Sequence, residues 1–339
     1  MSRPVTMEDI ARELGISKMT VSKALRGMRH VSPETRRKVK EAAKLMGYRP
    51  NPLVSSLMQQ VRSGKVVGRK LTLAYIARNR TIVREHDART NIEAATSRAA
   101  ELGYHLEVFS LNEFGDAAHM GKVLHARGIQ GIICGPMDDL AGWKGFPWQH
   151  FSAVSSGMGH ARLPIAQVRR NISQGIRLTD RKLREAGFKR PAVLFTHRRD
   201  SELDMIAEGA IHIMIQYGPG DPALIHPMDS PENIRKWLRS SKPDVIILHY
   251  PPNLEMLQAA GYDIDGPIPI VTLKRRGPRD PLAGIDHRPD EVGRIAVEYL
   301  NQEIQLNRTG LIENPITLMV DCIWVDNPGF ISHAPVRRS

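Results

Sequence analysis

The fold of the N-terminal region is decided by the stretch Thr6-Met-Glu-Asp-Ile-Ala-Arg-Glu-Leu-Gly15-Ile-Ser17-Lys-Met-Thr-Val-Ser-Lys-Ala-Leu25. Asp9 follows Thr6 at nearly the spacing of a capping box, and the apolar residues after it recur at helical spacing. Gly15 is suited to end this first helix with a left-handed turn, and Ser17 is a favourable N-cap for a second helix. Two short helices joined in this way predict a helix-turn-helix, which places its second helix in the major groove of DNA.

A third helix and a shorter segment follow this motif. Ser32 and Pro33 predict a helix start, because the amide that proline lacks is not needed at the first helical position. We expect this helix to run to about Met46 and to end at Gly47. The next stretch, Asn51-Pro-Leu-Val-Ser-Ser-Leu-Met58, has the start of a helix, but eight residues are too few for a stable helix in water. We therefore expect it to fold only where something supports it.

Positive charge is concentrated in this same region. The net charge of the 339-residue chain is +12. Residues 1–62 hold thirteen Lys/Arg and five Asp/Glu, and three further basic residues follow by residue 70, so residues 71–339 contribute only about +1. A basic head on a nearly neutral body is typical of nucleic-acid-binding proteins. The alternative is a basic face that is merely solvated.

Several functional classes are disfavoured by what the sequence lacks. Cys134 and Cys322 lie far apart without metal-type spacing, so we expect no zinc, no other metal and no cofactor. No apolar stretch approaches the roughly 20 residues of a membrane span and no export signal opens the chain, so we expect a cytoplasmic protein without a membrane partner. No Walker loop, GxSxG or HExxH motif occurs, so we expect no catalytic residues and a protein that is not an enzyme.

The remainder of the chain alternates between strand-like and helical patterns after a polar, glycine-containing linker at residues 59–70. Helices are expected near 88–102 and 116–126. Such alternation predicts parallel sheets in two doubly wound blocks, about 71–167 and 168–288. The apolar runs that predict the strands are Leu71–Ile76, His105–Phe109, Ile129–Cys134, Phe151–Ser155, Ala192–Phe195, Val245–Leu248 and Ile268–Thr272.

The head resembles the LacI/GalR family of bacterial transcriptional regulators. The matching segments lie at fixed spacing: Val5-Thr-Met-Glu-Asp-Ile-Ala11, Gly15-Ile-Ser17, Thr20-Val-Ser-Lys23, His30-Val-Ser32, Thr35-Arg36 and Gly47-Tyr48-Arg-Pro-Asn51. The resemblance implies that DNA bases are read by Lys18, Met19 and Lys23. It implies that phosphates are held by Thr6, Ser17, Ser22, His30, Ser32 and Asn51.

These roles are chemically reasonable on the second helix. Met19 offers an apolar contact to a thymine methyl group, and Lys23 can donate to guanine, although less rigidly than the arginine that is common in the family at this position. Simple attraction to phosphates is the alternative for Lys18 and Lys23. The resemblance also implies that residues 51–58 are a hinge helix that orders on operator DNA, with Leu57 wedged into the minor groove. An inert linker is the alternative for this segment.

For the whole chain the resemblance implies an all-α helix-turn-helix head and hinge helix followed by a two-lobed, periplasmic-binding-protein-like α/β body. We expect the helix-turn-helix domain at 1–50, the hinge helix and linker at 51–70, an effector-binding and dimerisation body at 71–332, and a tail at 333–339. The chain would cross three times between an N-lobe of about 71–167 plus 289–317 and a C-lobe of about 168–288 plus 318–332.

The effector site is the least defined part of this expectation. Ligands of such folds bind between the lobes at the carboxyl ends of strands. At positions where many family members grip sugar hydroxyls, this chain has Ser155, Ile206 and His249. Loop residues that follow the expected strands lean basic, which is compatible with a sugar, a sugar phosphate or an acid sugar, and equally with a degenerate pocket that takes no effector. These candidate pocket residues are Arg78, Asn79, Met137, Asp138, Ser155, His197, Arg198, Tyr250, Lys274 and His287.

The implied partners are double-stranded operator DNA and a second copy of the chain. Pro328, Gly329 and Pro335 interrupt the C-terminal segment and no leucine heptad is present, so a homodimer is expected rather than a tetramer. A symmetric pair of heads implies a pseudo-palindromic operator. Repression is the family's usual mode of action. A solute-binding protein is the alternative function of the two-lobed body.

Overall fold

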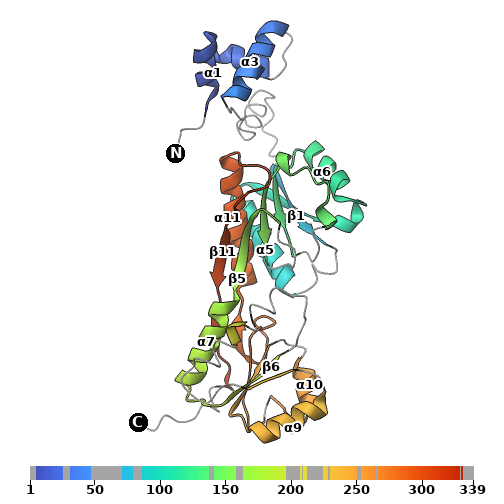
Figure 1. The fold of residues 1–339 in the computed structure, drawn as a ribbon, viewed down its shortest axis with the longest axis vertical. Coiled ribbons are helices and arrows are strands. Elements are labelled where there is room, and N and C mark those ends of the chain that lie inside the picture. Colours follow the sequence, from blue (N-terminus) through green and yellow to red (C-terminus); the bar gives the residue numbers. More distant parts are fainter. Residues whose placement is uncertain are drawn as a thin grey trace. The chain divides into compact units, whose positions relative to one another are not determined.

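The computed structural model divides the chain into a small N-terminal unit, which extends to Arg69, and a larger unit that begins at Lys70 (Figure 1). The first is the head and the second is the body. The residues that the structure describes are 5–25, 31–46, 71–78, 86–136, 141–157, 163–195, 207, 209–211, 224–227, 230–249, 253–264, 266–328 and 330.

The head contains three helices, α1 (Met7–Leu14), α2 (Lys18–Leu25) and α3 (Pro33–Leu45). The expected start of α1 is confirmed: the Thr6 hydroxyl accepts from the Asp9 amide, and the Asp9 carboxylate accepts from the Thr6 amide at 2.8 Å. Gly15 has a left-handed backbone with φ of 63°, as the expected turn requires. The core of the head is apolar and includes Ile10, Ala11, Val21, Ala24, Val31, Val39, Ala42 and Ala43.

The first lobe of the body is a six-stranded parallel sheet with the order β11-β5-β4-β3-β1-β2. Alternate residues of each strand point to opposite faces of the sheet. Both faces therefore carry side chains, and helices cover both faces. Helix α6 (Ala117–Ala126) packs on one face, while Gly131 of β3 lies against Leu300 and Ile304 of α11 (Pro289–Gln305) on the other. The strands are β1 (Leu71–Ala77), β2 (Tyr104–Ser110), β3 (Gly131–Cys134), β4 (Ser152–Ser156), β5 (Ala166–Asn171) and β11 (Thr317–Asp321).

Further helical segments complete this lobe. Helix α5 (His86–Glu101) lies very close to α11. Glycine at position 293 permits this approach, because a Cβ atom there would overlap the backbone carbonyl of Asn91. The lobe also contains three single helical turns: η2 (Leu111–Glu113), η3 (Ala141–Trp143) and η4 (Trp148–His150). Two of them carry Trp143 and Trp148, which belong to the buried cluster beside α6. Cys134 is also buried in this cluster.

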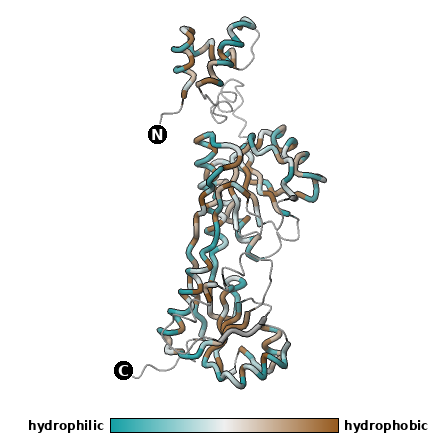
Figure 2. The backbone as a smooth tube through the Cα atoms, in the orientation of Figure 1, coloured by the Kyte–Doolittle hydropathy of each residue, from teal (hydrophilic) through white to brown (hydrophobic). Residues whose placement is uncertain are grey.

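The second lobe has a six-stranded sheet with the order β12-β10-β9-β8-β6-β7, in which only β12 runs antiparallel. Helix α7 (Ile172–Glu185) packs on one face and helices α9 (Pro231–Ser241) and α10 (Asn253–Ala259) pack on the other. Figure 2 shows hydrophobic residues concentrated along the strands, with α9 largely hydrophilic. The strands are β6 (Pro191–Phe195), β7 (Leu224–Pro227), β8 (Val245–Leu248), β9 (Ile270–Thr272), β10 (Ala283–Asp286) and β12 (Ile323–Val325).

The chain passes between the lobes after β5, after β10 and at Cys322, between β11 and β12. Two of the three expected boundaries need correction. The boundary at 167/168 falls inside β5, which pairs with β4 or β11 from Ala166 to Asn171, and that at 317/318 falls at the start of β11. The composition of β5, Ala-Gln-Val-Arg-Arg-Asn, explains the first error, because it lacks the apolar run of a buried strand.

Candidate functional site

Helix α2 of the head holds the residues that the sequence assigned to base reading. Val21 and Ala24 are buried in the core of the head, whereas Lys18 and Met19 are exposed and Lys23 is half-buried. Met19 is 65 % exposed, which is unusual for a large apolar side chain. An exposed methionine beside a lysine on a short helix is a surface suited to the floor of the DNA major groove, where thymine methyl groups and base acceptors lie side by side.

Three of the expected phosphate-contacting residues cap helices of the head. Ser17 and Ser32 cap α2 and α3: the Ser17 hydroxyl accepts from the Thr20 amide at 3.0 Å and the Ser32 hydroxyl from the Thr35 amide at 3.1 Å. Thr6 caps α1 in the same way. All three therefore lie at helix starts, where backbone amides point outward and favour anions.

One contact within the head involves a base-reading position. The Lys18 ammonium lies 3.1 Å from the Glu8 carboxylate, and both side chains are well exposed. Exposed ion pairs of this kind contribute little to stability, so this contact does not hold the Lys18 ammonium firmly in place.

Part of the sequence-based site lies outside the described residues. These positions are the phosphate-contacting His30 and Asn51, the wedge residue Leu57 with the rest of the hinge segment 51–70, and the pocket candidates Asn79, Met137, Asp138, His197, Arg198 and Tyr250. Ile206 lies outside them as well.

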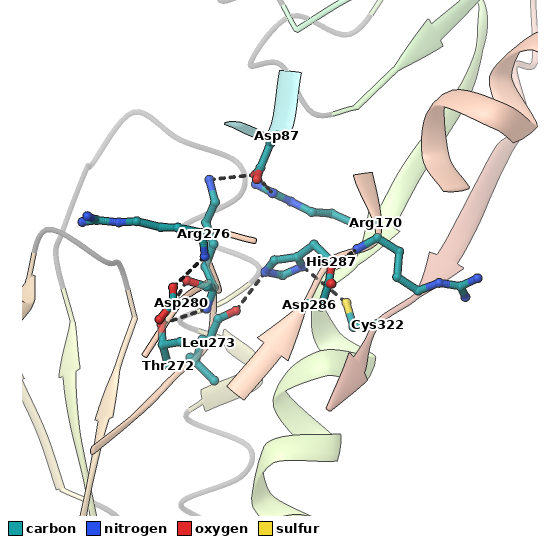
Figure 3. Close-up of polar contacts among 11 residues, drawn as sticks. Asp87, Arg170, Thr272, Leu273, Arg276, Asp280, Asp286, His287 and Cys322 are labelled. Carbon is teal, nitrogen blue, oxygen red and sulfur yellow. Dashed lines mark hydrogen bonds and ion pairs between the residues drawn. The ribbon is translucent and has the colours of Figure 1, made fainter. Parts of the chain in front are cut away.

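In the body, a charged cluster joins the two lobes (Figure 3). Asp87, in the first turn of α5, accepts from Lys274, which follows β9 in the second lobe, at 2.9 Å. Arg170, near the end of β5, donates to the same carboxylate oxygen at 3.2 Å. Burial disfavours the Asp87 carboxylate, but Lys274 and Arg170 outweigh it and hold the pKa of Asp87 below its usual value.

His287 lies beside this group, at the point where the chain returns to the first lobe. Its Nε2 is 2.8 Å from the carbonyl oxygen of Leu273, and its Nδ1 is 3.3 Å from the Cys322 sulfur. Desolvation, with the charges of Arg170 and Lys274, holds the pKa of His287 well below its usual value. The imidazole is therefore neutral near pH 7, and burial raises the pKa of the Cys322 thiol to about 12.

The structure brings together some of the expected pocket residues and adds others. Lys274 and His287 were expected and lie in this cluster, whereas Asp87, Arg170 and Cys322 were not. Ser155 lies at the carboxyl end of β4, and Arg78 directly follows β1. His249, which replaces a common sugar-gripping residue, stacks on Phe195 with ring centroids 4.1 Å apart. One sequence signal could have identified Asp87: it lies in the first turn of α5, a helix that follows β1 in the sequence.

The described residues contain no group of three or more His, Cys, Asp or Glu side chains that could hold a metal ion. Within the described helices, none is both long and apolar enough to cross a membrane.

Comparison with protein families matches residues 6–51 to the bacterial regulatory proteins of the lacI family. Over 57 residues the chain is 46% identical to the transcriptional regulator GalS of Salmonella typhimurium, an alignment that covers 17% of each chain. Over 53 residues it is 47% identical to catabolite control protein A of Staphylococcus epidermidis, covering 16% of each. Over 140 residues it is 31% identical to the lactose operon repressor of Escherichia coli, covering 40% of this chain and 36% of the repressor. These alignments thus span less than two thirds of the length of each relative.

Comparison with solved structures shows similarity over nearly the whole chain and not only over the head. The lac repressor dimer bound to operator and the anti-inducer ONPF matches with a TM-score of 0.55 at 20% identity, covering 97% of this chain and 100% of that one. The complex of the transcriptional regulator CelR with cellobiose gives a TM-score of 0.54 at 18% identity, covering 96% and 99%. At such identities the match establishes the fold alone.

Proposed function

We propose that this chain, whose head belongs to the LacI family of bacterial regulatory proteins, is a sequence-specific DNA-binding transcriptional regulator that acts as a repressor. One observation carries the proposal: the family match covers the head, and within it α2 exposes Lys18 and Met19 while Val21 and Ala24 are buried. A body with the lac repressor fold supports the same function.

In this proposal α2 enters the major groove and Lys18, Met19 and Lys23 contact base edges. Thr6, Ser17, Ser22, His30, Ser32 and Asn51 hold phosphates and fix the register. Two heads of a homodimer read the two halves of a pseudo-palindromic operator, which is the arrangement expected for a two-fold symmetric protein. The chain acts where its DNA lies, in the cytoplasm, and catalyses no reaction.

The electrostatic part of this proposal predicts a steep salt dependence. Each lysine or arginine that neutralises a phosphate releases counterions, so binding to a duplex should weaken markedly as salt rises. If about six lysines and arginines of the basic head each neutralise one phosphate, the affinity should fall roughly a thousandfold between 50 and 200 mM salt. Fluorescence anisotropy on a labelled duplex measures this slope, and an affinity that does not change with salt would rule out the electrostatic account.

The hinge part of the proposal rests on Leu57. If this leucine enters a base step and kinks the duplex, Leu57→Ala should weaken binding to the preferred site much more than binding to random DNA. Leu53→Ala is the matched control, because it removes the same side chain four residues earlier. Equal losses on the two DNAs for Leu57→Ala would show that the segment is an ordinary linker.

The body is proposed to bind a small effector at the junction of its lobes, where the ends of parallel strands meet. The proximity of Arg170 and Lys274 supports a sugar phosphate or acid sugar over a neutral sugar. The alternative is a regulator with a degenerate pocket that responds to no small effector. A solute-binding protein is the remaining alternative, and the basic head disfavours it.

A further inference from the structure

An acidic side chain lies beside one of the proposed base-reading residues. Glu8, in the first turn of α1, forms an ion pair with Lys18, the first residue of α2, and their charged atoms are 3.1 Å apart. The pair therefore bridges the two helices of the helix-turn-helix. The other ion pairs among the described residues of the head each lie within one helix: Asp9 with Arg12, Glu34 with Lys38, and Arg37 with Glu41.

The fold of the head does not depend on this ion pair. The Lys18 side chain is 60 % exposed and the Glu8 side chain 63 %, and pairs as exposed as this contribute little to stability. The start of α1 is capped by Thr6 and Asp9, which leaves the Glu8 carboxylate outside the capping box. Glu8 instead places a negative charge beside a residue that is proposed to enter the DNA groove, where the phosphates repel it.

We propose that Glu8 is a specificity-determining residue of the DNA interface, which weakens binding to non-specific duplexes more than binding to the preferred site. This inference rests on the proposed regulatory function. It adds to that function a residue outside the sets proposed for base reading and phosphate contact.

The discrimination follows from the chemistry of the Lys18 ammonium, which has three donor hydrogens. At the preferred site it can donate to a base acceptor, such as guanine O6 or N7, and keep its contact with Glu8. The charge of the carboxylate then stays compensated.

A non-specific duplex binds almost entirely through its phosphates. Because the ion pair is weak, phosphates draw Lys18 away from Glu8 and leave the carboxylate unpaired beside like charges. Glu8 therefore costs more affinity on the wrong DNA than on the right one, and such a difference is what specificity requires.

The test is the ratio of two affinities for Glu8→Gln in the full-length protein. Anisotropy measures binding to the duplex that the wild type enriches from a random-sequence pool and to a scrambled duplex of the same length and salt. Glutamine removes the charge and nearly preserves the volume. Affinity for the scrambled duplex should rise about tenfold and affinity for the preferred duplex less than about threefold.

The salt dependence gives a second readout. Without Glu8, Lys18 is free to neutralise one further phosphate of the scrambled duplex. The slope of log affinity against log salt on that duplex should therefore steepen by about 1 for Glu8→Gln.

Two further variants separate this role from a general effect of charge. Glu41→Gln is the matched control, because Glu41 is 61 % exposed and pairs with Arg37 within α3. It removes the same charge from the same head and should leave the ratio of affinities unchanged. In a Lys18→Met background, Glu8→Gln should raise both affinities alike, because the pair no longer exists.

The proposal is overturned if the ratio for Glu8→Gln equals that for Glu41→Gln, or if Glu8→Gln still lowers the ratio in the Lys18→Met background. The wild type tests the proposed function separately. A wild type that prefers no duplex overturns the proposed function and this inference with it. A wild type that discriminates, together with an unchanged ratio for Glu8→Gln, overturns only the role of Glu8.

Discussion

An Ile10→Ala variant is expected to lose about tenfold or more in affinity for its preferred duplex, because most of its heads will be unfolded. Ile10 is fully buried in the core of the head. Removing a buried aliphatic side chain costs about 2–5 kcal/mol, and a domain of this size rarely has more than about 3–5 kcal/mol of stability. Only the part of this cost that exceeds the stability of the head lowers the apparent affinity, and an excess of about 1.4 kcal/mol corresponds to a tenfold loss.

The body should be unaffected by this substitution, because it is a separate compact unit. Calorimetric unfolding should show the transition of the body at its wild-type temperature, while anisotropy reports the loss of DNA binding. Leu45→Ala is the control, since Leu45 is 88 % exposed and its truncation creates no cavity. An Ile10→Ala variant that binds its duplex within a factor of a few of Leu45→Ala would contradict the role assigned to this core.

The second large effect is expected in the body, from Gly284→Ala. Gly284 in β10 pairs with Thr272 in β9, and a Cβ atom at Gly284 would overlap the Thr272 carbonyl group. Its φ of 151° is also one that other residues rarely adopt. Because backbone rather than a movable side chain blocks the space, the two strands must separate. A cost of about 3 kcal/mol would lower the unfolding temperature of the body by roughly 6–12 °C.

Gly209→Ala is the matched control for this prediction. Gly209 is helical, and no described residue outside its own helix backbone and chain neighbours has an atom within 4 Å of the position that its Cβ would occupy. Alanine is favoured over glycine in a helix by up to about 1 kcal/mol, so Gly209→Ala should not lower the unfolding temperature. If thermal unfolding of the two variants proves indistinguishable, the close approach of β9 and β10 does not limit the stability of the lobe.

The secondary structure that local chemistry determines was predictable from the sequence. The caps at Thr6, Ser17 and Ser32 and the turn at Gly15 depend on neighbours within three or four residues, so their pattern is visible without a fold. Strands buried on both faces, such as β3 and β8, also have an unmistakable apolar run. Strand β5 lacks such a run, and its place in the sheet is set by β4 and β11 instead.

The charged cluster at the lobe junction shows where sequence reasoning ends. Lys274 and His287 follow strands of the second lobe and were expected there for that reason. Asp87 and Arg170 were missed because their proximity to Lys274 depends on the packing of α5 and β5 against the end of β9, across almost 190 residues of sequence. No local spacing encodes such a contact, and a charged residue at a helix start more often lies at the surface.

The most direct test of the central claim is selection of bound duplexes from a random-sequence pool by the full-length protein, followed by sequencing. The account predicts that one near-palindromic site becomes enriched, and that Ile10→Ala enriches it much less. A pool that remains random after selection by the wild type, or that Ile10→Ala enriches equally well, would contradict the claim that this head reads DNA sequence.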